Sequence, residues 1–465
     1  MARPKTSPDA AQSHVAPAVP HLLHRFPAPH GGAIVAAVCF LSGDRLLSGG
    51  LDRCLRIHSA VPPYRQLATL RGHTGIVTAV ASLDDGGFVS ASMDHSLRLW
   101  SASMPYTCVG LLAGHQGAVN AVALLGKDWA SKARETTSVC TCQACYSAAQ
   151  VRPRVALSGA VAGEAAAHNI PMLVSVSWDR TARVHLLEPP YTTLAVCEGH
   201  EDGILAVTAL REGRAAFATG GADGTVRVWA CPPTFAPLAL LKAHAPCAVR
   251  ALAALPNEGF VSGGSDGTLH LWHVRSDSEG HDAAAASRLR GAGLARDNCA
   301  KNDKGKDNDQ SISFVCQTIL KGPPDATVAV ATAHHAMILL AGSLGHRLQV
   351  WRIRHHASRK HTASGRERRL SSSDSVNEKG MPYKRARLLK PDECESVGGD
   401  CLAALEAHQE CVFSVAVTPC GTRALSGGFD SAMVLWDLEV CAQLGLPAIV
   451  GQAAFLSFHP ISHHY

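Results

Sequence analysis

Residues 92–100 read SMDHSLRLW, in which Asp94 is followed six positions later by Trp100. The same spacing of an Asp and a Trp returns in ADGTVRVW, SDGTLHLW and FDSAMVLW. Two weaker copies end in histidine, and a degenerate copy has Gly345 where the Asp belongs. The seven phrases start at Asp52, Asp94, Asp179, Asp223, Asp266, Gly345 and Asp430. A phrase that returns this often predicts an array of similar structural units.

Apolar and polar residues alternate on both sides of each phrase. In residues 88–100, one alternating run leads into a turn around Asp94 and a second run leads out of it. Such alternation is typical of a strand with one face in a core. Gly224 and Gly267, which follow the Asp in two copies, suit a tight turn. Each phrase therefore predicts two strands joined by a tight turn.

A hydroxyl residue and a histidine accompany most of the phrases. Ser or Thr stands four residues before the Asp in every copy except the degenerate one, which has Ala341. A Gly-His or Ala-His pair usually stands 21 to 23 residues before the Asp. A half-buried carboxylate needs hydrogen-bond donors, and imidazole, hydroxyl and indole groups supply them. We therefore expect the His, Ser or Thr, Asp and Trp of one copy to form a structural cluster.

These residues resemble the structural tetrad of WD40 repeats, and the resemblance covers about residues 22–438. It implies an all-β fold, a seven-bladed WD40 β-propeller in which each blade is a four-stranded sheet around a central channel. The resemblance assigns tetrad roles to His73, Ser90, Asp94 and Trp100; His200, Thr219, Asp223 and Trp229; His244, Ser262, Asp266 and Trp272; and His408, Ser426, Asp430 and Trp436.

The spacing of the phrases also predicts the domain organisation. Three of the six steps between phrases are 79 or 85 residues long, against 42 to 44 for the others, which indicates long and disordered insertions. The apolar run from Leu22 to Phe26 is expected to supply the last outer strand of the ring. The expected parts are a disordered tail at 1–20, a propeller at 21–438, insertions at about 126–170, 276–310 and 355–400, and an extension at 439–465.

The composition predicts an intracellular protein. The first 20 residues contain no continuous apolar core, so no secretory signal is expected, and sixteen cysteines then indicate reduced thiols. Cys140, Cys142 and Cys145 could bind zinc, but a fourth ligand is missing and His168 is distant. A mobile loop with incidental cysteines is the preferred interpretation, with no metal and no other cofactor.

The basic residues are concentrated in one segment. The net charge of +5 is too small to indicate nucleic-acid binding, and residues 352–390 alone hold 12 Lys and Arg against 3 acidic residues. Within this segment, two basic clusters with a spacer resemble a bipartite nuclear-import signal; a solvated loop is the alternative. The candidate residues are Arg368, Arg369, Lys384, Arg385 and Arg387. We expect a nuclear or nucleolar protein, with the cytoplasm as the alternative location.

The C-terminal extension is apolar, since residues 440–458 contain no charge. The alternative interpretation, a membrane span, is weakened by Gln443, Pro447 and Gln452 and by a length close to the minimum. We expect this segment to pack on the propeller as one or two strands, with no contact to a membrane.

One stretch imitates a catalytic motif. Residues 263–267 read GGSDG and fit the G-x-S-x-G pattern of esterases. That pattern requires a turn from a strand to a helix, whereas Asp266 here begins a repeat phrase between two strands. The match is therefore accidental, and we expect a protein that is not an enzyme.

The irregular positions beside each Asp are the candidate site for a partner. Large apolar residues precede the Asp at Leu51, Met93, Trp178 and Phe429, and these belong to consecutive blades because the seventh blade closes on the first. Arg53 and Arg180 follow the Asp and could pair with an acidic partner. A cluster with Trp, Phe and Met is typical of a hot spot in a protein interface. The alternative is that these side chains fold inward or lie under the insertions.

Two function classes fit a non-catalytic propeller. The first is a scaffold within a multi-protein assembly, and the order LLSGGLD, LRGHTGIVTAV, SVSWDRTARV and AHQECVFSV resembles the propeller of nucleolar ribosome-assembly WD40 factors. The second is a ubiquitin-pathway adaptor, because the stretch from EGHEDGILAV to AHAPCAVRALAAL resembles the propeller of ubiquitin-binding WD40 proteins. Both imply other proteins as partners, no direct nucleic-acid site, and a monomer within a larger complex.

Overall fold

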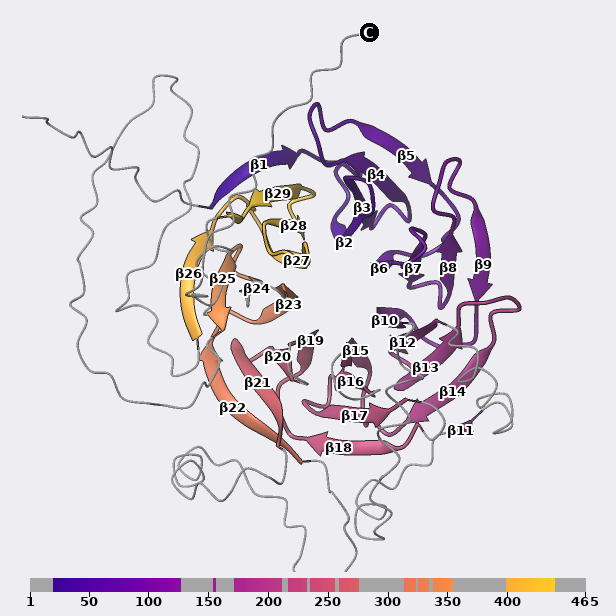
Figure 1. Ribbon diagram of the computed structural model, residues 1–465, viewed down its shortest axis with the longest axis vertical. Coiled ribbons are helices and arrows are strands. Elements are labelled where there is room, and N and C mark those ends of the chain that lie inside the picture. The colour runs from indigo at the N-terminus through magenta and orange to yellow at the C-terminus, as the bar shows by residue number, and fades with distance from the viewer. Residues whose placement is uncertain are drawn as a thin grey trace, which may run out of the picture.

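The chain folds into a closed ring of seven antiparallel sheets around a central channel (Figure 1). The computed structural model describes residues 20–126, 154–155, 171–210, 216–231, 235–255, 259–275, 313–322, 325–333, 338–353 and 399–439. Every regular element in this part of the chain is a strand. The seven-bladed β-propeller predicted from the repeats is therefore confirmed.

Each blade places its first strand at the channel and its last strand on the outside. Blade one contains β2 (Val35–Leu41), β3 (Arg45–Gly50), β4 (Leu55–Ser59) and β5 (Gln66–Leu70). Blade two contains β6 (Val77–Ser82), β7 (Phe88–Ser92), β8 (Leu97–Trp100) and β9 (Cys108–Leu112). Blade three contains β10 (Val119–Gly126), β12 (Met172–Ser177), β13 (Thr181–Leu186), β14 (Thr193–Glu198) and β11 (Arg154–Val155).

The remaining blades follow the same order. Blade four contains β15 (Ile204–Leu210), β16 (Ala216–Gly221), β17 (Val226–Ala230) and β18 (Pro237–Leu241). Blade five contains β19 (Val249–Ala254), β20 (Phe260–Gly264), β21 (Thr268–Arg275) and β22 (Ser313–Lys321). Blade six contains β23 (Thr327–Ala333), β24 (Ile338–Ser343), β25 (Leu348–Ile353) and β26 (Gly399–Leu405). Blade seven contains β27 (Val412–Val417), β28 (Arg423–Gly428), β29 (Met433–Asp437) and β1 (His21–Phe26).

The ring closes between its two ends. β1, predicted from the apolar run at Leu22 to Phe26, pairs with β29 in an antiparallel register that joins His21 to Asp437 and Phe26 to Met433. Blade seven thus takes its outer strand from the start of the chain and its other strands from the end. The closure leaves no blade open toward its neighbours, which removes the edge-strand problem of an open array.

Apolar side chains fill the space between adjacent blades. Phe88, Phe217 and Phe260 are fully buried, and each ring stacks on the Trp of its own blade. These contacts follow from the alternation in the repeat phrases, because every second residue of a strand points to the same face of its sheet. The repeat Trp thus serves the core as well as the hydrogen-bonded cluster.

The two ends of the ring differ in what they carry. In an antiparallel blade, the turn between the second and third strands lies at the same end as the loop that leads into the first strand. We call this end the turn face; its seven turns are residues 51–53, 93–95, 178–180, 222–224, 265–267, 344–346 and 429–431. The three long insertions lie between β10 and β12, between β21 and β22, and between β25 and β26. These three connections start and end at the opposite end of the ring.

The termini of the described propeller also lie at that opposite end, because β1 begins beside Asp437, the last residue of β29. Two residues of the first insertion form β11, which pairs with β14 and adds a fifth strand to blade three. The other residues of the insertions, the tail before residue 20 and the extension after residue 439 lie outside the described residues. Among the residues that are described, no helix is long and apolar enough to cross a membrane.

Candidate functional site

The predicted tetrad residues meet in one hydrogen-bonded chain in blade two. His73 Nδ1 lies 2.8 Å from a carboxylate oxygen of Asp94, and His73 Nε2 lies 2.8 Å from Ser90 Oγ. The indole N–H of Trp100 donates to the same Ser90 Oγ at 2.9 Å. Since a carboxylate can only accept, Nδ1 of the imidazole carries the proton and Nε2 accepts from the Ser90 hydroxyl.

Blades four, five and seven contain the same four-residue chain. The corresponding distances are between 2.8 and 3.1 Å. The structure thus brings together all sixteen side chains that the sequence assigned to tetrads. They join the loop ahead of the first strand to the second and third strands of each blade, so their polar groups are used in holding the blade.

Hydrogen bonds keep the tetrad carboxylates ionised. Burial alone would raise the pKa of Asp94, but hydrogen bonds from Ser96, His73 and the Thr74 N–H outweigh it and hold the pKa at about 2. The pKa of Asp430 is likewise held at about 2. Burial lowers the pKa of His73, so its ring is neutral at neutral pH. A neutral imidazole that bridges a carboxylate and a hydroxyl is a structural link here.

Blades one and three carry a histidine in place of the tetrad Trp. In blade three, Nε2 of His185 lies 2.9 Å from Ser175 Oγ, where the other blades place the indole nitrogen. Burial lowers the pKa of His185 to about 3, which keeps the ring uncharged. His58 takes the corresponding position in blade one, and burial lowers its pKa to about 4.

One tetrad histidine was not predicted from the sequence. His30 lies 2.7 Å from Asp52 and 2.9 Å from Ser48, and it is almost completely buried. The signal was present, because His30 stands 22 residues before Asp52, within the spacing of the other copies. It follows Pro29 rather than Gly or Ala, and a search for the dipeptide alone therefore passes over it.

Blade six lacks the tetrad and has a different set of polar contacts. The indole N–H of Trp351 donates to the side-chain oxygen of Gln349 at 3.2 Å, which replaces the missing Ser. The carboxylate of Asp325 reaches the space that a β-carbon on Gly345 would take. A hollow of about 470 Å³ lies beside it, lined by Asp325, Leu344, Gly345, His346 and Arg347.

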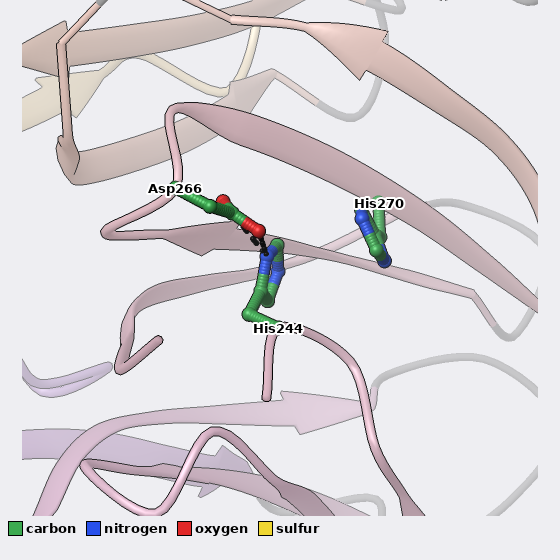
Figure 2. Close-up of side chains that lie close together, drawn as sticks. All are labelled: His244, Asp266 and His270. Atoms are coloured by element: carbon green, nitrogen blue, oxygen red, sulfur yellow. Dashed lines mark hydrogen bonds and ion pairs between the residues drawn. The ribbon is translucent and has the colours of Figure 1, made fainter. Parts of the chain in front are cut away.

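Blade five brings a second histidine to its tetrad (Figure 2). Ligand atoms of His244, Asp266 and His270 lie within 4.8 Å of one another, a separation that a metal ion could bridge. The two imidazole rings are close, with centroids 4.2 Å apart and planes inclined by 36°. Both nitrogens of His244, however, already have partners, since Nδ1 lies 2.9 Å from Asp266 and Nε2 lies 2.9 Å from Ser262 Oγ, which favours the structural role over a metal ion. Blades one to four have arginine at the position of His270.

One backbone hydrogen bond recurs in all seven blades and fixes the turn face. The N–H of the residue before the repeat Asp donates to the carbonyl of the residue before the first strand. Met93 donates to Ile76, and Trp178 donates to Ala118. The equivalent pairs are Leu51 and Ile34, Ala222 and Gly203, Ser265 and Ala248, Leu344 and Ala326, and Phe429 and Cys411. The seven side chains before the Asp therefore start from equivalent backbone positions.

Large apolar side chains at this position are exposed. Leu51, Met93, Trp178 and Phe429, all candidates from the sequence, are between 41% and 50% exposed, and Leu344 of blade six is 38% exposed. Blades six, seven, one, two and three are consecutive around the ring, so the five side chains form an arc. We call this set of five residues the apolar arc. Ala222 and Ser265 complete the circle with small side chains.

Arg53 and Arg180 also lie on the turn face and are exposed. They stand directly after Asp52 and Asp179, so each is two residues from a member of the apolar arc. The nuclear-import candidates Arg368, Arg369, Lys384, Arg385 and Arg387, the Cys140 to Cys145 cluster and the apolar C-terminal segment lie outside the described residues. They stay predictions from the sequence.

A hollow among the innermost strands and the G-x-S-x-G stretch contain few reactive groups. A hollow of about 310 Å³ lies among the innermost strands and is lined mainly by alanine, valine and leucine. Its thiol, Cys39, has a pKa raised by burial to about 12, which keeps it protonated. Ser265 lies in the turn between β20 and β21, where its hydroxyl accepts a 2.7 Å hydrogen bond from Arg250. No strand-to-helix turn holds this serine.

Comparisons with known proteins agree with the geometry. The model of the family described as WD domain, G-beta repeat matches residues 64–101, 191–230, 235–273 and 399–437. Each match begins with the outer strand of one blade and ends with the third strand of the next. The chain is also 43% identical over 70 residues to WD repeat-containing protein 25 of Mus musculus. This similarity covers 14% of the chain and 12% of the length of that relative.

Proposed function

The chain belongs to the WD40-repeat β-propeller proteins, and from that premise we propose that it is a non-catalytic scaffold that holds other proteins on its turn face. WD40 propellers generally act as interaction scaffolds. The observation that carries the proposal for this chain is the apolar arc. Five exposed apolar side chains stand at one structural position in consecutive blades. Exposed apolar side chains gathered on one face of a protein often mark a site that binds a partner.

The composition of the apolar arc suits a protein partner. Trp178 and Phe429 are large aromatic anchors with few rotatable bonds, and Met93 is adaptable in shape. Energy in protein interfaces is concentrated in a few such residues, surrounded by contacts that exclude water. The turns are short and held by the recurring hydrogen bond, so little conformational entropy is lost when a partner binds.

The position of the apolar arc favours access. The three long insertions join the propeller at the end opposite the turn face, as do β1 and the end of β29. A partner on the turn face therefore approaches compact turns of three residues. The polar groups of the tetrads are used within the blades, so they are not free to bind a partner.

Within this class we propose a factor for ribosome assembly in the nucleus or nucleolus. The support is the order of the repeat phrases and the two basic clusters around Arg368 and Lys384. A ubiquitin-pathway adaptor is the second candidate, supported by the phrases around His200 and His244. Location and partners separate the two, because the first predicts nucleolar protein with ribosomal precursors and the second predicts cytosolic protein with ubiquitin.

Affinity capture with matched variants tests the proposal. The full-length chain, Trp178→Ala with Phe429→Ala, and Val109→Ala with Leu111→Ala are each tagged and their captured proteins quantified. Val109 and Leu111 on β9 are 51% and 55% exposed but lie on the outer side of blade two, so they form the control. We expect the first variant alone to lose its captured proteins, with thermal stability within about 1 kcal/mol of the natural chain. Equal capture by all three proteins contradicts the proposal.

A further inference from the structure

Two arginines on the turn face occupy a backbone conformation that favours glycine. Arg53 and Arg180 have φ angles of 65° and 66°, in the left-handed region. Blades four and five have Gly224 and Gly267 at the same position, with φ angles of 75° and 74°, and blades two, six and seven have His95, His346 and Ser431 there, with φ angles of 67°, 67° and 61°. A side chain in this region is disfavoured by contact between its β-carbon and the backbone. The turn therefore imposes this conformation in all seven blades, and in blades one and three it carries an exposed guanidinium group.

These arginines have no counter-charge within the described part of the chain. Neither Arg53 nor Arg180 makes a side-chain hydrogen bond or an ion pair there, and the same holds for Arg71, which is exposed in the loop ahead of β6. By contrast, Arg56 pairs with Asp52, and Arg25 pairs with Asp430. The three arginines belong to blades one to three, where they present positive charge to solvent.

The acidic groups of the turn face lie mostly outside blades one to three. Its exposed carboxylates are Glu201 and Asp202, in the loop between blades three and four, and Asp266, Asp325 and Glu410, in blades five to seven. The exposed basic residues Lys242, Arg250, Lys321 and Arg347 accompany these carboxylates in the loop ahead of blade five and in blades five and six. In blades one to three, the tetrad carboxylates of Asp52, Asp94 and Asp179 are bound to histidines. The face therefore has a positive sector over blades one to three, which we define by Arg53, Arg71 and Arg180.

We propose that the segment bound by the apolar arc is acidic as well as apolar, and that its carboxylates lie over the positive sector. This inference rests on the proposed function. Arg53 and Arg180 each stand two residues from an apolar side chain, Leu51 and Trp178. A bound chain that inserts an apolar residue at either place brings its neighbouring residues to a guanidinium. Carboxylates are the groups that guanidinium binds with two parallel hydrogen bonds.

A nucleic acid fits the same surface less well. Arginine and an aromatic ring can bind phosphate and stack on a base. Leu51, Met93 and Leu344, however, provide aliphatic contact that a base or a phosphate does not need. An acidic peptide needs only the sector where the arginines and the apolar side chains alternate.

A displayed library of random peptides of about 12 residues tests the inference. The library is selected on the full-length chain and, as controls, on Trp178→Ala with Phe429→Ala and on a variant with Arg53→Gln, Arg71→Gln and Arg180→Gln. We expect enriched peptides with apolar residues and a net negative charge, which neither variant enriches. Replacing Asp and Glu by Asn and Gln in such a peptide should weaken binding about tenfold, and added salt should weaken the acidic form more.

The outcomes separate the two proposals. Enriched peptides that depend on Trp178 and Phe429 but are neutral or basic overturn the acidic partner and leave the scaffold function in place. The absence of any peptide that depends on those two residues contradicts the scaffold function on this face as well. Binding of a labelled single-stranded oligouridine that competes with the enriched peptides overturns the acidic-peptide inference in favour of a nucleic acid.

Discussion

The indole ring of Trp178 lies on the backbone of Gly203, so closely that a β-carbon on residue 203 would overlap Cε3 of the ring. Gly203 stands directly before the first strand of blade four, and the other six blades have a residue with a side chain at this position. The absence of a side chain on Gly203 thus makes room for the ring at the boundary of blades three and four. One face of the indole is packed, and half of the side chain is exposed.

The packing of Trp178 on Gly203 predicts that Gly203→Ala displaces the indole ring although residue 178 itself is not mutated. The added methyl group should push the ring into solvent, because the ring lies at the surface while the strand behind Gly203 is fixed by pairing. Partner binding should weaken about as much as in Trp178→Ala, since a held aromatic ring loses less entropy on binding than a free one. The other tryptophans in the described part of the chain are buried, so in proteins that also carry Trp129→Phe a red shift of fluorescence reports the displacement of the Trp178 ring.

Ala118→Gly at the equivalent position of blade three is the matched control for this variant. It alters the same backbone position without adding a group near an aromatic ring. If the emission spectrum and the binding affinity of Gly203→Ala stay unchanged, the packing of Trp178 on Gly203 does not hold the ring for binding.

Arg53→Gly and Arg180→Gly test the left-handed arginines. Glycine adopts this conformation without contact between a β-carbon and the backbone, so the strain of about 1 kcal/mol per residue is relieved, partly offset by the entropy of the unfolded chain. The free energy of unfolding should stay level or rise by up to about 1 kcal/mol, while partner binding falls. Urea unfolding and binding measured on the same samples check both. A clear loss of stability indicates that the arginines serve the fold.

The sequence predicted the architecture more completely than the site. The repeat phrases carry both the strand alternation and the tetrad, so the blades and the closing strand at Leu22 to Phe26 could be read from them. His30 was passed over because its neighbour is proline. The packing of Trp178 on Gly203 could not be predicted, because it is a contact between the turn of one blade and the loop that leads into the next. The strain at Arg53 likewise depends on a backbone angle that residue identity does not reveal.

The low pKa values of the tetrad carboxylates predict loss of stability in acid. The folded pKa of Asp94 and Asp430 is about 2, below the ordinary value of 3.8. Such a group stabilises the fold fully above its unfolded pKa, and this contribution is lost as the pH falls from about 4 through about 2. Urea unfolding at pH 7, 5, 4 and 3 should show the steepest fall in the free energy of unfolding between the last two values. Asp94→Asn should be less stable at pH 7 and should show a smaller fall.

His185 predicts a second pH dependence, with a different range. Its folded pKa is about 3, because burial disfavours the charged ring. The unfolded chain binds a proton at this residue below about pH 6.5, whereas the folded protein stays neutral, so stability falls as the pH decreases from about 6.5 to about 3. The slope is about 1.4 kcal/mol per pH unit for one proton. His185→Trp, which copies the tetrad of the other blades, should reduce the slope of the free energy of unfolding by about one proton.

Gln349 supports the blade that lacks a tetrad, and its removal should show how much that support contributes. Its side-chain oxygen accepts the indole N–H of Trp351, and both residues are buried. Gln349→Leu keeps the approximate size of the side chain but leaves the indole N–H without an acceptor, at a cost of about 1 to 3 kcal/mol. Gln349→Glu is the matched variant, because it keeps an acceptor but introduces a buried charge. Urea unfolding should therefore rank the natural chain as the most stable of the three. Equal stability of Gln349→Leu and the natural chain would mean that the indole hydrogen bond contributes nothing to blade six.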